Sequence, residues 1–163
     1  MAKTINDFNL IGDSTMVRAA KMLYNAIVKY APYQKIKDAV FISRVEGRKN
    51  SRFITVSINM REETGGAPFA RAFDIGSGLH GKKHAKYIIV PKRFPTLQFI
   101  GTNEFAGKII RTKKVEHPGV VGVGYTRKAM DEVKPTIRSE IAAEAKESIR
   151  LYLRAQFSEL GKK

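Results

Sequence analysis

The 163 residues include neither cysteine nor tryptophan. The lack of cysteine excludes disulfides, thiolate metal sites, iron–sulfur ligation and cysteine nucleophiles, and it is compatible with a reducing compartment. Acidic residues are scarce, since 15 Asp and Glu stand against 30 Lys and Arg and leave a formal net charge of +15. Such a surplus favours contact with a polyanion or with an acidic protein surface.

Long apolar runs are also absent. No stretch approaches the roughly 18 uninterrupted apolar residues of a membrane span, and Met1–Phe8 lacks the apolar core of a signal peptide. We therefore expect a soluble chain, made inside the cell, with no membrane contact. Its 43% hydrophobic and 28% charged residues are ordinary for a globular protein that encloses one core.

Helices are predicted at both ends of the chain. In residues 13–30 apolar side chains recur every three or four residues behind a cap at Asp13 or Ser14, and Ala31-Pro32 ends the pattern. Near the C-terminus, Thr126 can cap a short segment through Val133, and Pro135 starts or kinks the next stretch.

The C-terminal stretch, residues 135–160, has apolar residues at a steady four-residue step. This stripe needs a cover, either from the chain's own sheet or from a neighbouring subunit. The candidate subunit-interface residues are Ile149, Leu153, Phe157 and Leu160.

Between the helices the pattern predicts strands. The expected elements are a hairpin of residues 40–45 and 53–60 with a polar connection over 46–51, a short helix from Phe69 to Phe73, a buried strand at 86–90, and two extended pieces, 97–100 and 108–115, around a turn at 101–107. The fold class is therefore α+β, with an antiparallel sheet packed by an N-terminal helix and a long C-terminal helix. We predict one domain, with an arm at 1–12, a helix-plus-sheet core at 13–133 and the C-terminal helix at 135–160.

The segment Gly76–Gly81 matches the dinucleotide pattern GxGxxG. A dinucleotide site needs a strand before the loop and a helix after it, whereas here lysines lead into a strand, so no cofactor is expected. A phosphate clamp of the KH type, built from Gly78–Gly81 and the adjacent lysines, is chemically sensible, but that module places its loop between two helices. A flexible loop is the favoured interpretation.

No residue pattern nominates catalysis. His80 and His84 are four residues apart, a spacing that brings them together only on a helix, and their segment has glycine on both sides and no obvious carboxylate partner. We therefore expect them and His117 to be solvated, and no metal site is predicted. There is no nucleophile elbow, and the carboxylates are scattered. We expect a protein that is not an enzyme and has no catalytic residues.

Positive charge is concentrated in the centre of the chain. The candidate surface for a partner or for DNA comprises Lys82, Lys83, Lys86, Lys92, Arg93, Lys108, Arg111, Lys113 and Lys114, and Glu104 is the only acidic residue between His80 and Lys114. One interpretation is a solvated sheet edge that charge protects from aggregation. The other is a face that meets phosphate or an acidic protein.

Several motifs, in the same order, resemble those of a family of tailed-phage minor structural proteins. The motifs are Ala31-Pro32 with 35–40, Ala72–Gly78, Ile89–Lys92 with Leu97–Phe99, Glu116–Gly119, and Tyr125–Pro135. In that family an "HPG" segment precedes a short aromatic-Arg-Ala helix and a longer C-terminal helix. The resemblance covers most of the chain.

The resemblance implies a neck or tail-completion protein that joins the phage head to the tail. Such a subunit would assemble with its own copies into a ring, expected to be a hexamer, and contact a connector or adaptor on one side and a tail terminator or tail tube on the other. DNA would pass through the lumen. The expected location is the virion neck or tail, and the host cytoplasm during assembly.

Two rival functions come from the residues themselves. The basic segment also suits a nucleic-acid-binding module of ribosomal or nucleoid type, although no aromatic stacking platform can be placed on one face. A hydrolase or nuclease would need clustered carboxylates to hold a metal ion.

Overall fold

The computed structural model describes residues 11–48, 51–101 and 103–160. In chain order the elements are α1 (Asp13–Tyr30), α2 (Gln34–Asp38), β1 (Val40–Ile42), β2 (Glu46–Arg48), β3 (Ser51–Phe53), β4 (Val56–Ile58), η2 (Glu62–Thr64), α3 (Ala70–Ile75), η3 (Gly78–His80), β5 (Tyr87–Ile89), β6 (Leu97–Ile100), η4 (Asn103–Phe105), β7 (Ile109–Thr112), β8 (Val115–His117) and α4 (Tyr125–Leu160). The fold class is α+β, as predicted. The predicted arm at 1–12 lies outside the described residues except for its last two.

Two compact units make up the chain. The helical unit is Met1–Ala70 with Tyr125–Lys163, and the hairpin unit is Arg71–Gly124. The single domain expected from the sequence stays a prediction, because contacts within a chain do not show whether a unit folds alone.

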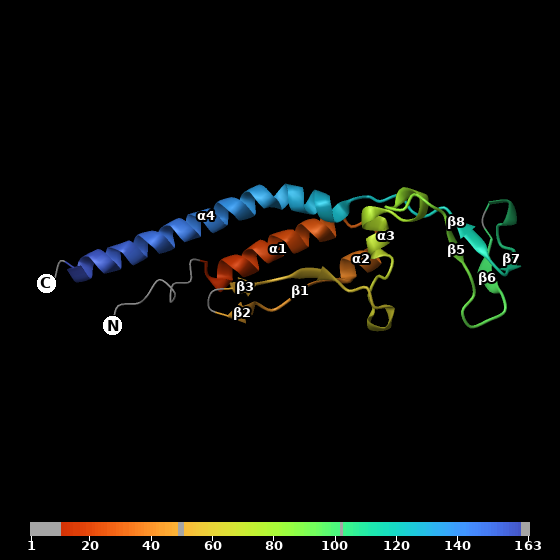
Figure 1. The fold of residues 1–163 in the computed structure, drawn as a ribbon, viewed down its shortest axis with the longest axis horizontal. Coiled ribbons are helices and arrows are strands. Elements are labelled where there is room, and N and C mark those ends of the chain that lie inside the picture. Colours follow the sequence, from red (N-terminus) through yellow and green to blue (C-terminus); the bar gives the residue numbers. More distant parts are fainter. Residues whose placement is uncertain (1–10, 49–50, 102, 161–163) are drawn as a thin grey trace. The chain divides into compact units, whose positions relative to one another are not determined.

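The helical unit is built on an antiparallel pair formed by α1 and the first half of α4 (Figure 1). Small side chains are buried within this unit, including Ala20 and Ala26 of α1 and Ala129 of α4. The antiparallel order of the two helices is also seen in the ion pairs, because Arg18 of α1 meets Glu140 of α4 whereas the later Lys29 meets the earlier Glu132.

The predicted range of α1 is confirmed, and its cap differs by one residue. Gly12 is the N-cap, and its extended backbone conformation places Asp13 in the first helical turn. At the other end, the Ala31 N–H donates to the carbonyl of Ile27 before Pro32 prevents further helix. The N-cap is bound to α4, because the Gly12 N–H donates to Glu144 Oε1 at 2.8 Å.

The Glu144 carboxylate gives this contact a pH dependence. Hydrogen bonds from the Thr15 hydroxyl and the Gly12 N–H, together with the nearby charge of Arg18, lower the pKa of Glu144 from its ordinary value near 4.5, against an opposing desolvation effect. A carboxyl group with a lowered pKa in the folded state stabilises the fold above its unfolded-state pKa and loses that effect as the pH falls through the folded-state value.

Replacing Glu144 by glutamine should therefore lower the melting temperature at neutral pH, with the deficit shrinking as the pH falls below about 4.5. Thermal unfolding followed by circular dichroism across the acid range measures this. Glu147→Gln, on an exposed part of the same helix, is the control. A deficit for Glu144→Gln that is the same at every pH would show that the charge of Glu144 does not stabilise the helix pair.

The C-terminal helix is one element rather than two. α4 runs from Tyr125 to Leu160 with Pro135 inside it, so the expected separation of a short segment ending at Val133 from a helix at 135–160 is wrong. Proline removes one backbone hydrogen bond from a helix interior. Tyr125, Ala129 and Val133 are buried on the preceding turns, and their packing holds the helix across this defect.

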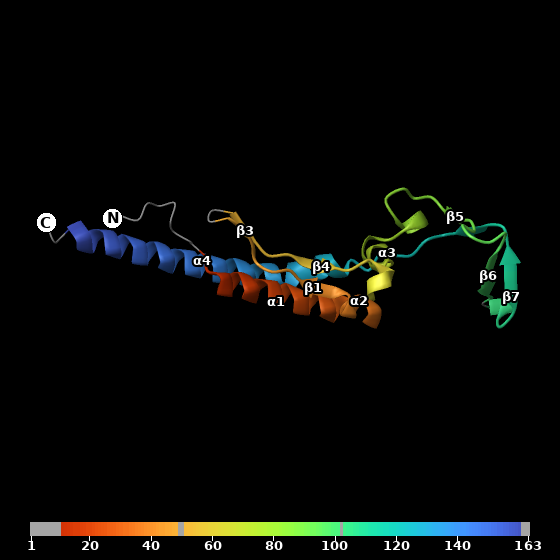
Figure 2. The ribbon, with the colours of Figure 1, turned by 90° about the horizontal axis from the view of Figure 1, so that it is seen from below.

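Strands in the helical unit form two short ribbons beside α1 (Figure 1; Figure 2). β1 pairs with β4 in antiparallel register, with Val40 opposite Ile58, which confirms the predicted hairpin. The predicted polar connection at 46–51 is partly wrong, because β2 and β3 continue the pairing as a second ladder. Backbone hydrogen bonding favours extending the ribbon even where the side chains are polar.

The hairpin unit contains two more antiparallel ribbons. β5 pairs with β8, and β6 pairs with β7. The expected strand at 108–115 is therefore two strands, and the Thr112 hydroxyl donates to the carbonyl of Lys114 in the turn between them. The predicted strand at 86–90 exists, but its predicted burial is wrong, since Ile88 and Val90 are exposed.

The sheet predicted from the sequence is thus divided. Within the described ranges, four two-stranded ribbons take the place of one continuous sheet. A two-stranded ribbon has two open edges and cannot bury both faces by itself. Much of the apolar surface of the strands consequently remains accessible.

A close backbone junction organises the hairpin unit. The Ser77 N–H donates to the carbonyl of Val120 at 2.9 Å, and the Leu79 N–H donates to that of Pro118 at 2.7 Å. Gly78 and Gly119 both have positive φ, and a Cβ on either one would collide with backbone of the opposite strand of the junction. The glycine-rich loop is therefore a packed structural element.

Candidate partner interfaces

All nine basic residues singled out in the sequence are exposed, and they are distributed over several segments of the hairpin unit. Lys82, Lys83 and Lys86 precede β5, and Lys92 and Arg93 lie between β5 and β6. Lys108 precedes β7, Arg111 lies within it, and Lys113 and Lys114 form the turn before β8. The structure thus confirms their exposure.

These nine side chains have no carboxylate partner among the described residues. The ion pairs of the described regions instead lie in the helical unit, and include Arg18 with Glu140, Lys29 with Glu132 and Lys35 with Glu62. The hairpin unit contains only three acidic residues against ten basic ones. Its positive charge is therefore available for a partner rather than used internally.

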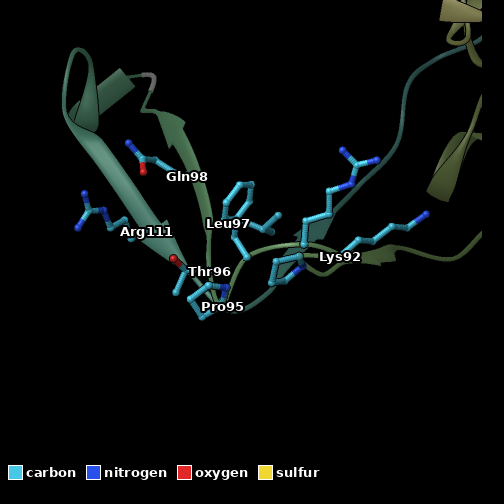
Figure 3. Close-up of a pocket in the computed structure, with 9 residues that line it drawn as sticks. Lys92, Pro95, Thr96, Leu97, Gln98 and Arg111 are labelled. Atoms are coloured by element: carbon cyan, nitrogen blue, oxygen red, sulfur yellow. The ribbon is translucent and has the colours of Figure 1, made fainter. Parts of the chain in front are cut away.

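A hollow of about 650 Å³ brings three of the nine together. Lys92 and Arg93 line it from the segment before β6, and Arg111 lines it from β7. Its other walls are uncharged and include Pro95, Thr96, Leu97 and Gln98 (Figure 3). The other six basic residues do not line this hollow.

The β6–β7 hairpin shows apolar side chains as well as charge. In its register Gln98 lies opposite Arg111, and Ile100 lies opposite Ile109. Side chains alternate between the faces of a strand, so these four share one face, and Figure 3 shows Gln98 and Arg111 pointing to the same side. Ile100 is 71% exposed and Ile109 is 62% exposed, which leaves an apolar pair uncovered near the end of the hairpin.

The second candidate surface is the distal half of α4. Because α1 begins at Asp13, beside Glu144, it does not cover the helix further along. Ile149 and Leu153 are each 47% exposed, and Phe157 is 68% exposed. These three predicted interface residues are therefore accessible, while the side chain of Leu160 lies outside the described set.

A step of four residues explains why the apolar stripe is only partly covered. Four residues turn by about 400° around the axis of a helix with 3.6 residues per turn, which is one full turn and about 40° more. The apolar stripe therefore shifts around the helix by about 40° at every repeat. Ile137 and Ile141 are partly buried on the half that packs against α1. By Phe157 the stripe has rotated by about 200° from Ile137, and it forms a separate surface.

His84 and His117, which the sequence predicts to be solvated, make contacts within the loops. His117 Nδ1 accepts a hydrogen bond from the Gly119 N–H at 2.9 Å, and its ring stacks on Tyr87 with centroids 5.0 Å apart. His84 contacts the carbonyl of Leu79 through Nδ1 at 3.2 Å. Nowhere in residues 11–48, 51–101 and 103–160 do three His, Asp or Glu side chains gather as a metal site requires.

Comparisons of the chain with family models, with curated proteins and with solved structures find no match. No helix in the described part of the chain has both the length and the apolar character to cross a bilayer.

Sequence reasoning missed three accessible features. The apolar pair of the hairpin depends on its register, which no local pattern specifies. Leu151 is 55% exposed on the side of α4 away from Ile149 and Leu153. The uncharged stretch from Phe94 to Gly101, which contains β6, is visible in the sequence as a gap between basic clusters and could have been noticed there.

Proposed function

We propose that the chain is a structural protein of the neck of a tailed phage, assembling as a ring that joins the head connector to the tail. The observation that carries the proposal is the uncovered apolar stripe of Ile149, Leu153 and Phe157, which a second copy of the chain can bury. Exposed apolar patches of this kind are typical of interaction sites.

The packing of the hairpin unit also supports this proposal. Two motifs of the family resemblance, Ala72–Gly78 and Glu116–Gly119, are far apart in the sequence but meet at the backbone junction. Motifs that build one structural element are expected to occur together in a family with a shared fold.

The mechanism of such a protein is geometrical. Identical subunits that use different patches on their two sides close into a ring when the rotation between them permits it. In the proposed ring the distal part of α4 forms subunit contacts, while the unpaired basic residues of the hairpin unit face a neighbouring ring or the DNA in the lumen. The chain performs no chemical conversion, and its partners are the connector or adaptor and the tail terminator or tail tube.

Replacing Leu153 by serine should weaken self-association about tenfold or more, because burial of a leucine side chain contributes about 1.5–3 kcal/mol. Light scattering after size-exclusion chromatography measures the change. Leu151→Ser is the matched control, since Leu151 has a comparable exposed fraction and projects about 200° away from Leu153 around the same helix. Equal weakening by the two variants would count against the stripe as the subunit contact.

The exposure of the nine basic side chains favours a nucleic-acid-binding module as the second candidate function. For that function, replacing Lys113 and Lys114 by glutamate should weaken duplex binding. It should also reduce the slope of the logarithm of the binding constant against the logarithm of the salt concentration by about 0.9 per lost phosphate contact. The neck protein should instead keep its self-association and lose assembly with a virion partner. Fluorescence anisotropy with a DNA duplex, measured over a range of salt concentrations, distinguishes the two.

A further inference from the structure

Strand β6 is an uncharged edge in a strongly basic unit. From Phe94 to Gly101 there is no Lys, Arg, Asp or Glu, whereas β7 is flanked by Lys108 and Lys113-Lys114. Proteins protect open strand edges with charge, especially lysine, against pairing with other chains. The outer edge of β7 has this protection, and that of β6 does not.

The ladder between β6 and β7 shows which backbone groups of β6 are free. The Gly101 N–H donates to the carbonyl of Lys108 at 2.8 Å, so this is a hydrogen-bonded pair. Hydrogen-bonded and non-hydrogen-bonded pairs alternate in an antiparallel ladder. The N–H and C=O groups of Gln98 and Ile100 therefore point away from β7, and no other strand of the described chain pairs with this edge.

The surroundings of this edge define the chemistry of an occupant. The hollow at the start of β6 is lined by Lys92, Arg93 and Arg111, none of which has a carboxylate partner among the described residues. Cations at its margin favour acidic side chains, while the uncharged wall from Pro95 to Gln98 accommodates the backbone of a chain lying along it.

An extended acidic segment fits better than a nucleic acid or a second hairpin unit. Phosphate oxygens only accept hydrogen bonds, so contacts from the phosphates of a nucleic acid would leave the outward carbonyls of Gln98 and Ile100 unpaired. A peptide backbone pairs with both the N–H and the C=O groups of a strand edge. A second hairpin unit carries the same positive excess and would be repelled.

We propose that the free edge of β6, together with the adjoining hollow, binds an extended acidic segment of a different protein by β-strand addition. The segment forms a third strand beside β6, and its carboxylates meet Lys92, Arg93 and Arg111. This inference builds on the proposed role as a partner-binding structural protein. Its test is independent of self-association through α4, so the two can fail separately.

The test uses the full chain labelled with ¹⁵N and a capped peptide of about eight residues that alternates valine and glutamate. We expect saturable binding in amide spectra, with hydrogen exchange slowed at Gln98 and Ile100. A peptide that alternates valine and lysine, and a single-stranded DNA of similar length, are the comparison probes. Both should leave the exchange of these two amides unchanged.

A proline substitution separates pairing by the backbone from contact through side chains. Gln98→Pro removes an outward N–H and leaves the bonds to β7 in place, a position at which an edge strand tolerates proline. It should weaken binding of the acidic peptide about tenfold, because one hydrogen bond is lost and its acceptor is left unpaired. Gln98→Ala retains the N–H and should bind as the unmodified chain does.

Integrity of the hairpin is checked by the cross-strand contact of Phe99 with Ile110 in each variant. Arg111→Glu should weaken binding of the valine–glutamate peptide, and the valine–lysine peptide should still not bind. The proposal is overturned by a lack of saturable binding at roughly 1 mM peptide, where even a weak complex is half formed. It is also overturned by equal binding of both peptides, by undiminished binding to Gln98→Pro, or by protection of these amides with DNA.

Discussion

Replacing Gly119 by alanine should destabilise the hairpin unit by about 2–5 kcal/mol, the sum expected for an unfavourable positive φ and for overpacking. Gly119 has a φ of +101°, and a Cβ built there would lie 1.9 Å from the carbonyl oxygen of Ser77. The obstacle is backbone rather than the end of a flexible side chain. The backbone could move away from the added Cβ only by breaking the hydrogen bonds that Ser77 and Leu79 donate across the junction.

Gly107→Ala is the matched control for this effect. Gly107 also has a positive φ, +77°, but no atom lies within 4 Å of its Cβ position. Gly107→Ala should therefore lower the free energy of unfolding only by the cost of the positive φ, about 1–2 kcal/mol. Urea unfolding and amide exchange of residues in β5 and β8 measure both variants. Equal destabilisation by the two substitutions would mean that the junction is not closely packed.

Replacing Tyr125 by alanine should destabilise the helical unit by about 3–5 kcal/mol, the range for deleting a large aromatic side chain from a core. Tyr125 begins α4 and is completely buried, and its hydroxyl donates to the carbonyl of Ala70 at 3.1 Å. The substitution leaves a cavity at the start of the helix pair and removes the partner of a buried carbonyl.

Tyr125→Phe separates these two contributions. It retains the ring and removes the hydroxyl donor, and should cost about 1 kcal/mol. Thermal and urea unfolding, followed by helical circular dichroism, compare the two variants. If Tyr125→Ala unfolds at the same denaturant concentration as the unmodified chain, Tyr125 is not part of the core.

Local signals were sufficient to predict several elements. The residues of α1 have a helical apolar period and a proline at a defined end, so its range follows from sequence alone. The pairing of β1 with β4 was predictable because the alternation in residues 53–60 is clear and the partner strand is close in the chain. The positions of β5 and β6 followed from the same kind of pattern.

Burial was harder to predict because it depends on what covers an element. The apolar run at Ile88 is typical of a buried strand, yet Ile88 is exposed, because no element of the described residues covers its side chain. In α4, apolar residues at a four-residue step predict one continuous buried stripe, although α1 covers only the first half of the helix. No local pattern specifies where that cover ends.

The candidate site was predicted in composition but not in arrangement. Net charge and exposure of the basic residues follow directly from the sequence. The gathering of Lys92, Arg93 and Arg111 around one hollow depends on a turn and on the β6–β7 register. The free edge of β6 follows from the absence of a third strand beside it among the described residues, which is a property of the fold rather than of the strand.

Electron microscopy of the purified full-length chain tests the central claim, that this protein works by assembling with its own copies. Averaged images at high protein concentration should show closed rings with a central opening, and the Leu153→Ser variant should show separated subunits under the same conditions. Images in which the unmodified chain is present only as single subunits, at every concentration up to roughly 1 mM, would contradict the account.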